Sequence, residues 1–111
     1  MKNQFVHEVI FCIVNSGFSE AVMDAAKKGG AKGGTVMNAR GTAGKEAEKF
    51  FGITVQEEKE IVMILVSSES KDKILQNLYD EVGLNTAGQG IAFSLPVDGV
   101  VGLSANAPEN N

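Results

Sequence analysis

Four apolar runs and two short amphipathic segments alternate along this chain, and their order restricts the folds that it can adopt. The apolar runs have the length and composition of strands, at residues 5–14, 35–40, 59–67 and 91–95. The amphipathic segments follow the first and the third run, at residues 19–28 and 70–82. The resulting order βαββαβ predicts a ferredoxin-like plait, an α+β fold in which two helices cover one face of a four-stranded antiparallel sheet.

The two predicted helices have recognisable ends. Ser19 is the expected N-cap of the first helix, and two lysines precede Gly29 at its end. Ser70 is expected to open the second helix, and Gly83 is placed to stop it. The last strand is expected to end at Pro96. The residues expected to face inward have helical spacing: Val22, Ala25 and Ala26, then Ile74, Leu75, Leu78 and Val82. Val100 and Val101 are a candidate short extension of the last strand.

The first and the third strand are apolar on both alternating faces, although two helices cover only one face of a sheet. The chain has 111 residues, of which 43% are hydrophobic, and this suits one domain with a modest core. We therefore expect a single domain at residues 1–103 and a polar tail at 104–111. The bare face of the sheet is expected to pack against other subunits in a closed homo-oligomer.

Composition excludes several classes of protein. The net charge of −4 disfavours a nucleic-acid binder, whose affinity comes from phosphate neutralisation. The longest apolar run, at 9–14, is too short to span a membrane and no signal peptide pattern precedes it, so we expect a cytoplasmic protein without membrane insertion. Cys12 is the only cysteine and falls within a predicted strand, which indicates a core residue and excludes an intrachain disulfide.

Two glycine-rich corners connect a helix to the next strand. One contains Gly29, Gly30, Gly33 and Gly34, and the other is the segment 88–90, Gly-Gln-Gly. Because glycine allows a backbone N–H to approach another group closely, such corners are a plausible cradle for an anionic ligand. Helix C-caps and tight turns are also made of glycine. Local spacing leaves both interpretations open.

The segment 40–58 is longer than an ordinary hairpin loop, and loops of this length are usually functional or disordered. It begins with Arg40, the only arginine of the chain, whose guanidinium could clamp a phosphate or a carboxylate or could be a solvated charge at a strand end. Its middle carries Phe50 and Phe51, which either form an exposed contact or fold onto the body. Residues 41–45 lack the spacing of a Walker phosphate loop.

The sequence contains no motif that indicates catalysis. No motif links His7, the only histidine, to Cys12 or to a serine, so we expect no enzyme activity. His7 and Glu8 point to opposite faces of a strand, and no metal site is expected.

These features together make the chain resemble the PII nitrogen regulatory family, and more closely its divergent PII-like branch. The resemblance rests on the plait and on three segments: 30–36, Arg40-Gly41 and 88–93. It implies a trimer that binds adenine nucleotides in the clefts between neighbouring subunits. It also implies a T-loop that contacts target proteins and a B-loop whose backbone N–H groups hold phosphates. By position, Gly33, Gly34 and Thr35 would border the base and ribose, Arg40 and Gly41 would form the T-loop hinge, and Gly88, Gln89 and Gly90 would form the B-loop.

The chain departs from the family where phosphates bind. The B-loop of nucleotide-binding members is Gly-Asp-Gly-Lys, and here Gln89 replaces the acid and Ile91 the lysine. Two arginines that the family carries near the C-terminus are replaced by Gly102 and Ser104. We therefore expect AMP, ADP or a non-nucleotide anion as the effector rather than ATP. The tyrosine that some members have uridylylated is absent from the loop.

The resemblance predicts a trimeric signal-transduction protein of nitrogen or carbon metabolism. A small anionic effector would bind between subunits, and the loop 40–58 would regulate a partner enzyme or transporter. The predicted partner contacts are Lys45, Lys49, Phe50 and Phe51. The alternative is a trimeric module of the CutA type, with a structural or metal-tolerance role and without an effector switch.

Overall fold

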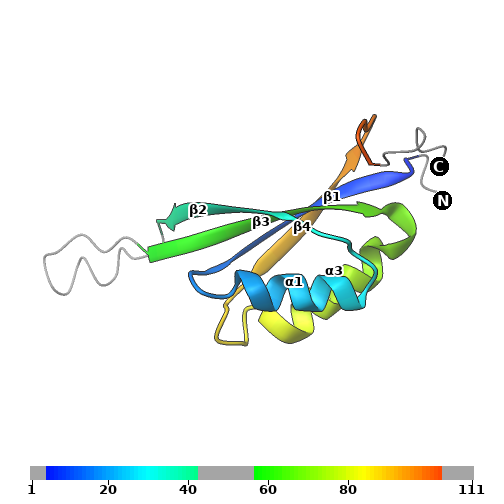
Figure 1. The fold of residues 1–111 in the computed structure, drawn as a ribbon. Coiled ribbons are helices and arrows are strands. Elements are labelled where there is room, and N and C mark those ends of the chain that lie inside the picture. The colour runs from blue at the N-terminus through cyan, green and yellow to red at the C-terminus, as the bar shows by residue number, and fades with distance from the viewer. Residues whose placement is uncertain (1–4, 43–56, 104–111) are drawn as a thin grey trace, which may run out of the picture.

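The computed structural model describes residues 5–42 and 57–103, and it confirms the ferredoxin-like plait. The elements are β1 (His7–Asn15), α1 (Ser19–Lys28), β2 (Thr35–Gly41), β3 (Glu57–Ser67), α3 (Ser68–Val82) and β4 (Ile91–Val97). The four strands form one antiparallel sheet in the order β2-β3-β1-β4. Both helices lie on the same side of this sheet (Figure 1). The strand order makes β2 and β4 the edges of the sheet.

The hydrophobic core lies between the helices and the sheet. Alternate residues of the two central strands face the helices and are buried: Ile10, Cys12 and Val14 on β1, and Val62, Ile64 and Val66 on β3. From the helices, Val22, Ala25, Ala26, Ile74, Leu78 and Val82 are buried as predicted. Leu75 is only half-buried at the edge of this core. Burial of about a dozen apolar side chains supplies most of the stability of a domain of this size.

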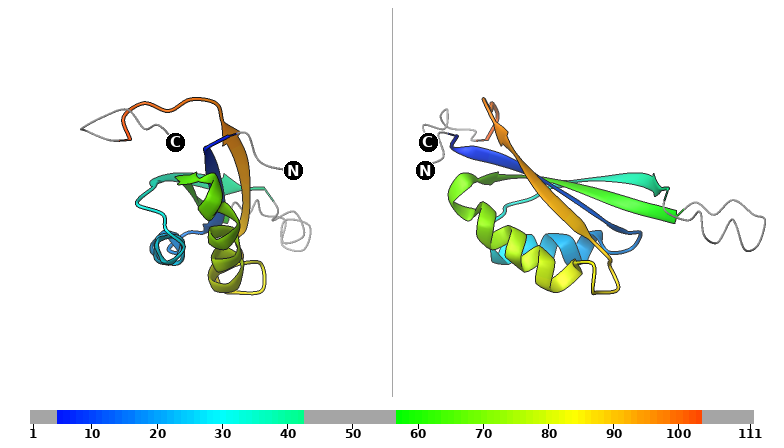
Figure 2. Two further views of the ribbon diagram at one scale, coloured as in Figure 1. Left: turned by 90° about the vertical axis from the view of Figure 1, so that its right-hand side faces the viewer. Right: turned by 180° about the vertical axis from the view of Figure 1, so that it is seen from behind.

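The face of the sheet away from the helices is also apolar, as the sequence predicts. We call it the open face, and it is made by three cross-strand rows: Val9, Leu65 and Leu95; Phe11, Met63 and Phe93; and Ile13, Ile61 and Ile91. The rings of Phe11 and Phe93 are stacked with their centroids 5.5 Å apart. Phe93 is still 45% exposed and Leu95 49% exposed. No helix lies on this side of the sheet in the described part of the chain (Figure 2).

The N-terminus of α1 is capped from a distant strand, and the prediction of Ser19 as its N-cap is wrong. Phe18 occupies the N-cap position, and Ser19 is the first helical residue. The Glu60 carboxylate on β3 accepts hydrogen bonds from the backbone N–H of Gly17 (2.9 Å) and of Ser19 (3.3 Å). A carboxylate at this position satisfies free N–H groups and interacts favourably with the helix dipole. Glu60 thus replaces the local serine cap.

Replacing Glu60 by alanine is expected to destabilise the fold by about 1–2 kcal/mol, which is the range measured for loss of an N-cap. Urea unfolding checks this, with Glu81→Ala on the exposed side of α3 as the control. Equal unfolding midpoints for the two variants would show that Glu60 does not cap α1.

Several predicted boundaries are shifted in the structure. The second helix begins at Ser68 rather than at Ser70, because Ser67 is its N-cap and its Oγ accepts the N–H of Ser70 (3.2 Å). The strand β4 continues through Pro96 to Val97. Proline has no backbone N–H to donate, and an edge strand tolerates it because one side of such a strand forms no ladder hydrogen bonds. Val100 and Val101 do not extend β4.

The predicted loop 40–58 is also too long at both ends. Arg40 and Gly41 belong to β2, and Glu57 and Glu58 belong to β3. These four residues pair across the sheet, so the base of the loop is a regular two-stranded ribbon.

Candidate functional site

Most of the predicted ligand-binding residues lie together at one end of the sheet, which we call the loop end. Arg40 lies near the end of β2 and pairs with Glu58 of β3, and the next residue of β3, Lys59, pairs with Ala39. Lys59 pairs in turn with Asn15 on β1, and the backbone N–H of Asn15 donates to the carbonyl oxygen of Gly88 (2.9 Å). Arg40 and the turn 88–90 are thus joined across three strands of the sheet.

The other predicted residues lie further along the sheet, at what we call the glycine end. Thr35 pairs with Met63 at the beginning of β2, and Gly33 lines a cavity together with Val9. Along β1, Val9 and Asn15 are six residues apart, which corresponds to about 20 Å. One protomer therefore does not bring Gly33, Gly34 and Thr35 together with the turn 88–90.

An open cavity of about 530 Å³ occupies the loop end. Its lining is Ser16, Asn38, Ala39, Arg40, Glu58 and Lys59. Arg40 pairs with Glu58 and Lys59 pairs with Ala39, so the side chains of Arg40 and Lys59 point to opposite faces of the sheet. The side chain of Lys59 is only 16% exposed. Its ammonium donates to Oδ1 of Asn15 (2.7 Å) and lies 3.2 Å from Oε2 of Glu57. An ammonium has three protons, so a third remains to bind an anion on the open face of the sheet.

Lys59 is the functional candidate that the sequence did not reveal. In sequence it is one of several charges at the start of a strand, where a solvated lysine is ordinary. Its position depends on Asn15, which is 44 residues away. Only the antiparallel register of β1 and β3 brings the two together.

The turn that follows α3 uses most of its own backbone N–H groups. The N–H of Gln89 donates to Thr86 (3.1 Å), and the N–H of Gly90 donates to the carbonyl oxygen of Val82 (2.6 Å). Gln89 adopts a φ of 48°, which is unusual for a residue with a side chain. Of the amides at 88–90, that of Gly88 alone has no partner within the described residues. A phosphate cradle in this conformation would have a single backbone donor.

Packing explains some of the glycines of the two corners but does not explain Gly33. A Cβ on Gly90 would lie 2.5 Å from the oxygen of Val82, and a Cβ on Gly34 would lie 3.0 Å from the Sδ of Met23. The tight-turn interpretation therefore suffices for Gly90 and Gly34. At Gly33, by contrast, a Cβ would meet no atom within 4 Å. The space beside Gly33 is open to a ligand.

The cavity at the glycine end has a different character from that at the loop end. It measures about 590 Å³ and is lined by Val9, Gly33, Gly34, Thr35, Met63, Leu65, Val97, Gly99, Val100 and Val101. None of these side chains carries a charge. Apolar walls with a single hydroxyl suit a flat, weakly polar ring rather than a phosphate.

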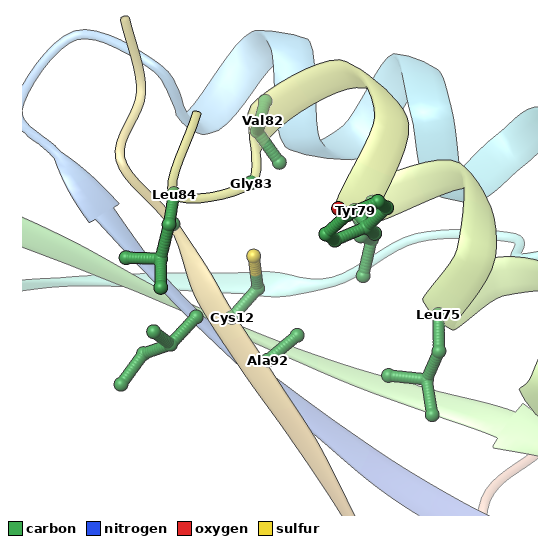
Figure 3. Close-up of a pocket in the computed structure, with 10 residues that line it drawn as sticks. Cys12, Leu75, Tyr79, Val82, Gly83, Leu84 and Ala92 are labelled. Atoms are coloured by element: carbon green, nitrogen blue, oxygen red, sulfur yellow. The ribbon is translucent and has the colours of Figure 1, made fainter. Parts of the chain in front are cut away.

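A separate apolar pocket of about 280 Å³ lies between α3 and β4 (Figure 3). Tyr79 and Leu84 stand at its rim, and Cys12 lies beneath them on β1. Burial raises the pKa of the Cys12 thiol to about 11. The thiol is therefore neutral near pH 7 and is a poor nucleophile. As the sequence indicates, Cys12 is a core residue.

In the described part of the chain, no cluster of side chains is arranged for metal binding. Within residues 5–42 and 57–103, no three side chains of histidine, cysteine, aspartate or glutamate gather as metal ligands. His7 lines a cavity with Lys32 and Ser67, and it lies on the opposite face of β1 from the buried thiol. Among the described helices, none has the length and apolar character needed to span a bilayer. The predicted partner contacts Lys45, Lys49, Phe50 and Phe51 lie outside the described residues.

The plait, its two glycine corners and the long segment between β2 and β3 define a protein of the PII signalling type. The sequence model of the nitrogen regulatory protein P-II family matches residues 7–106. The chain belongs to the P-II family. None of the curated proteins compared with the chain matches it.

Solved structures agree with this fold. A candidate PII-like signalling protein from Thermus thermophilus is 23% identical with a TM-score of 0.63, and the match covers 86% of this chain and 90% of that one. The PII protein of Arabidopsis thaliana, solved with citrate bound, is 24% identical with a TM-score of 0.60, and the match covers 84% of this chain and 78% of that one.

Proposed function

We propose that this protein is a cytoplasmic PII-like regulator of nitrogen or carbon metabolism that works as a homotrimer. A small anionic effector binds between neighbouring subunits, and the segment between β2 and β3 signals its presence to a partner enzyme or transporter. The observation that carries this proposal is that two unlike half-sites, the loop end and the glycine end, lie at separate ends of one sheet. A ligand that needs both must contact two protomers.

The chemistry of the half-sites indicates the class of effector. The loop end carries the cations Arg40 and Lys59 on opposite faces of the sheet, and the glycine end offers apolar walls beside Gly33. A molecule with a phosphate at one end and an aromatic ring at the other, such as AMP or ADP, matches this pair. A closed ring of protomers would place the loop end of one against the glycine end of the next.

The charge available favours a less charged effector than ATP. The Lys59–Glu57 pair is a partly exposed ion pair, with the glutamate side chain 42% exposed, and such pairs contribute about 1 kcal/mol or less. An incoming anion can therefore displace the Glu57 carboxylate from the ammonium. The single ammonium of Lys59 suits a weakly charged effector better than a triphosphate, and a carboxylate such as one of those of citrate, which the Arabidopsis PII protein binds, can pair with it as a phosphate does.

The open face supports assembly, and its disruption tests the proposal. Introducing a charge by Phe93→Asp is expected to convert the trimer to monomers, because a buried unpaired carboxylate is strongly unfavourable at an apolar interface. AMP binding is expected to be lost in the same variant, since the site needs two protomers. Sedimentation equilibrium and isothermal titration with AMP measure the two effects.

The control is Tyr79→Asp, which introduces the same charge at an exposed aromatic residue of α3. It is expected to leave assembly and binding unchanged. Monomeric Phe93→Asp protein that binds AMP with the affinity of the wild type would overturn the intersubunit site. Titrations of the wild type with AMP, ADP, ATP and citrate that all show no binding would overturn the effector role.

A further inference from the structure

The apolar cavity at the glycine end continues into a second cavity with a different lining, which we call the polar chamber. The polar chamber measures about 510 Å³ and shares Gly33 and Leu65 with the apolar cavity, so the two adjoin. Its polar side chains are those of His7, Lys32 and Ser67. No acidic residue of the described part of the chain lines it. The glycine end therefore combines apolar walls with a neighbouring patch of positive and hydrogen-bonding groups.

The strand register places the imidazole of His7 on the same face of the sheet as the apolar cavity. His7 pairs with Ser67 across β1 and β3, and Val9 pairs with Leu65 in the next row on that face. Both Val9 and Leu65 line the apolar cavity. Phe11, in the central row of the open face, is four residues from His7 along β1, which corresponds to about 13 Å. The polar chamber thus lies at the margin of the open face.

Two of the three polar side chains of the chamber have no partner among the described residues. Neither the imidazole of His7, which is half-buried, nor the ammonium of Lys32 forms a hydrogen bond or an ion pair there. The hydroxyl of Ser67 is already used, because it donates to Oγ of Ser70 (3.0 Å) and accepts the N–H of Ser70. A neutral imidazole carries one N–H donor, and an ammonium carries three. His7 and Lys32 therefore supply donors and a charge that no described carboxylate neutralises.

We propose that His7 and Lys32 form an anion subsite that, together with the adjoining apolar cavity, binds an aromatic carboxylate or phosphate ester on a single protomer. The ring of the ligand occupies the apolar cavity, where the absence of a side chain at Gly33 leaves open space. Its anionic group accepts hydrogen bonds from the imidazole and the ammonium. This inference goes beyond the proposed function, because it needs neither Lys59 nor a neighbouring subunit.

The test titrates the full chain with phenyl phosphate, benzoate and phenol, which share a ring and differ in the group attached to it. Because His7 is the only histidine, its imidazole gives a single set of ring signals in an NMR spectrum. We expect phenyl phosphate or benzoate, or both, to shift these signals to saturation. Phenol carries no charge near pH 7 and is expected to bind at least about tenfold more weakly. The tighter of the two anions identifies the kind of charged group.

Variants of the two residues separate their roles, and isothermal titration with the tighter anion measures them. His7→Phe keeps an aromatic ring but loses the donor, and it is expected to weaken binding about fivefold or more. His7→Gln restores a donor and is expected to lose less than about twofold. Lys32→Gln is expected to weaken binding about tenfold. Lys28→Gln removes the same charge from the exposed last turn of α1, outside the chamber, and should bind as the wild type does.

Several results would overturn the subsite. These are His7 signals that neither anion shifts, phenol binding as tight as that of the anions, full affinity in His7→Phe, and an equal loss in Lys32→Gln and Lys28→Gln. Lys59→Gln separates the subsite from the proposed function, since it is expected to leave the binding of the tighter anion unchanged. A loss of that binding in Lys59→Gln would assign the anion to Lys59 and overturn the subsite, while the proposed function would stand.

Discussion

Replacing Gly90 by alanine is expected to lower the free energy of unfolding by about 3 kcal/mol, the upper range for forcing a methyl group into a packed site. The new Cβ would lie 2.5 Å from the carbonyl oxygen of Val82 and 2.9 Å from Cγ1 of Val14. Neither neighbour can easily move. The oxygen of Val82 accepts the N–H of Gly90 itself (2.6 Å), and Val14 is fully buried. For a domain of this size the melting temperature should fall by more than about 10 °C.

The matched control for this variant is Gly99→Ala. A Cβ at Gly99 meets no atom within 4 Å, and the residue has no positive φ, so a change below about 0.5 kcal/mol is expected. Thermal and urea unfolding must use equal protein concentrations, because assembly stabilises the folded state by mass action. Equal stability of the two variants would show that the turn is packed differently around Gly90.

Lys59→Gln is expected to have the largest effect on effector binding. The glutamine side chain can still approach Asn15, but it has no charge to attract the anion. Charge-assisted hydrogen bonds contribute about 1.5–3 kcal/mol, so the affinity for AMP should fall about tenfold to a hundredfold. The same titration should show a weaker dependence on salt, because one ionic contact has been removed.

Lys73→Gln makes the same change of charge at an exposed position of α3 and should bind AMP as the wild type does. Comparison with this variant separates the local contact from the overall charge of the protein. An equal loss of AMP affinity in Lys59→Gln and Lys73→Gln would mean that binding depends on the net charge of the protein rather than on a local site. In that case the phosphate of AMP does not bind at Lys59.

The sequence predicts the fold because the relevant signals are local and mutually consistent. The period of the apolar residues identifies both helices and the two central strands, and Gly83 marks the end of α3. Two of the predictions that failed depend on contacts between distant segments. Ser19 looks like an N-cap, but the carboxylate of Glu60 reaches α1 from β3, 41 residues away. Pro96 looks like the end of a strand, yet β4 is an edge, a fact that only the strand order gives.

The candidate site was predicted only in part, for the same physical reason. Glycine corners and a lone arginine are visible in sequence, and the structure places Arg40 and the turn 88–90 at one end of the sheet. Whether a glycine serves packing or leaves room for a ligand depends on its neighbours in space. Gly34 and Gly33 are adjacent in sequence, but only Gly34 is closely packed. The position of the Lys59 side chain depends on Asn15, which no local pattern connects to it.

The proposed pairing of unlike half-sites from neighbouring subunits has a consequence for the number of ligands bound. In a closed ring every loop end meets a glycine end, so the number of ligands bound at saturation equals the number of subunits. An open row of subunits would leave one unpaired half-site at each of its two ends. It would therefore bind one ligand fewer than its number of subunits. Stoichiometry measured at saturation therefore reports whether the assembly closes on itself, without any image of the complex.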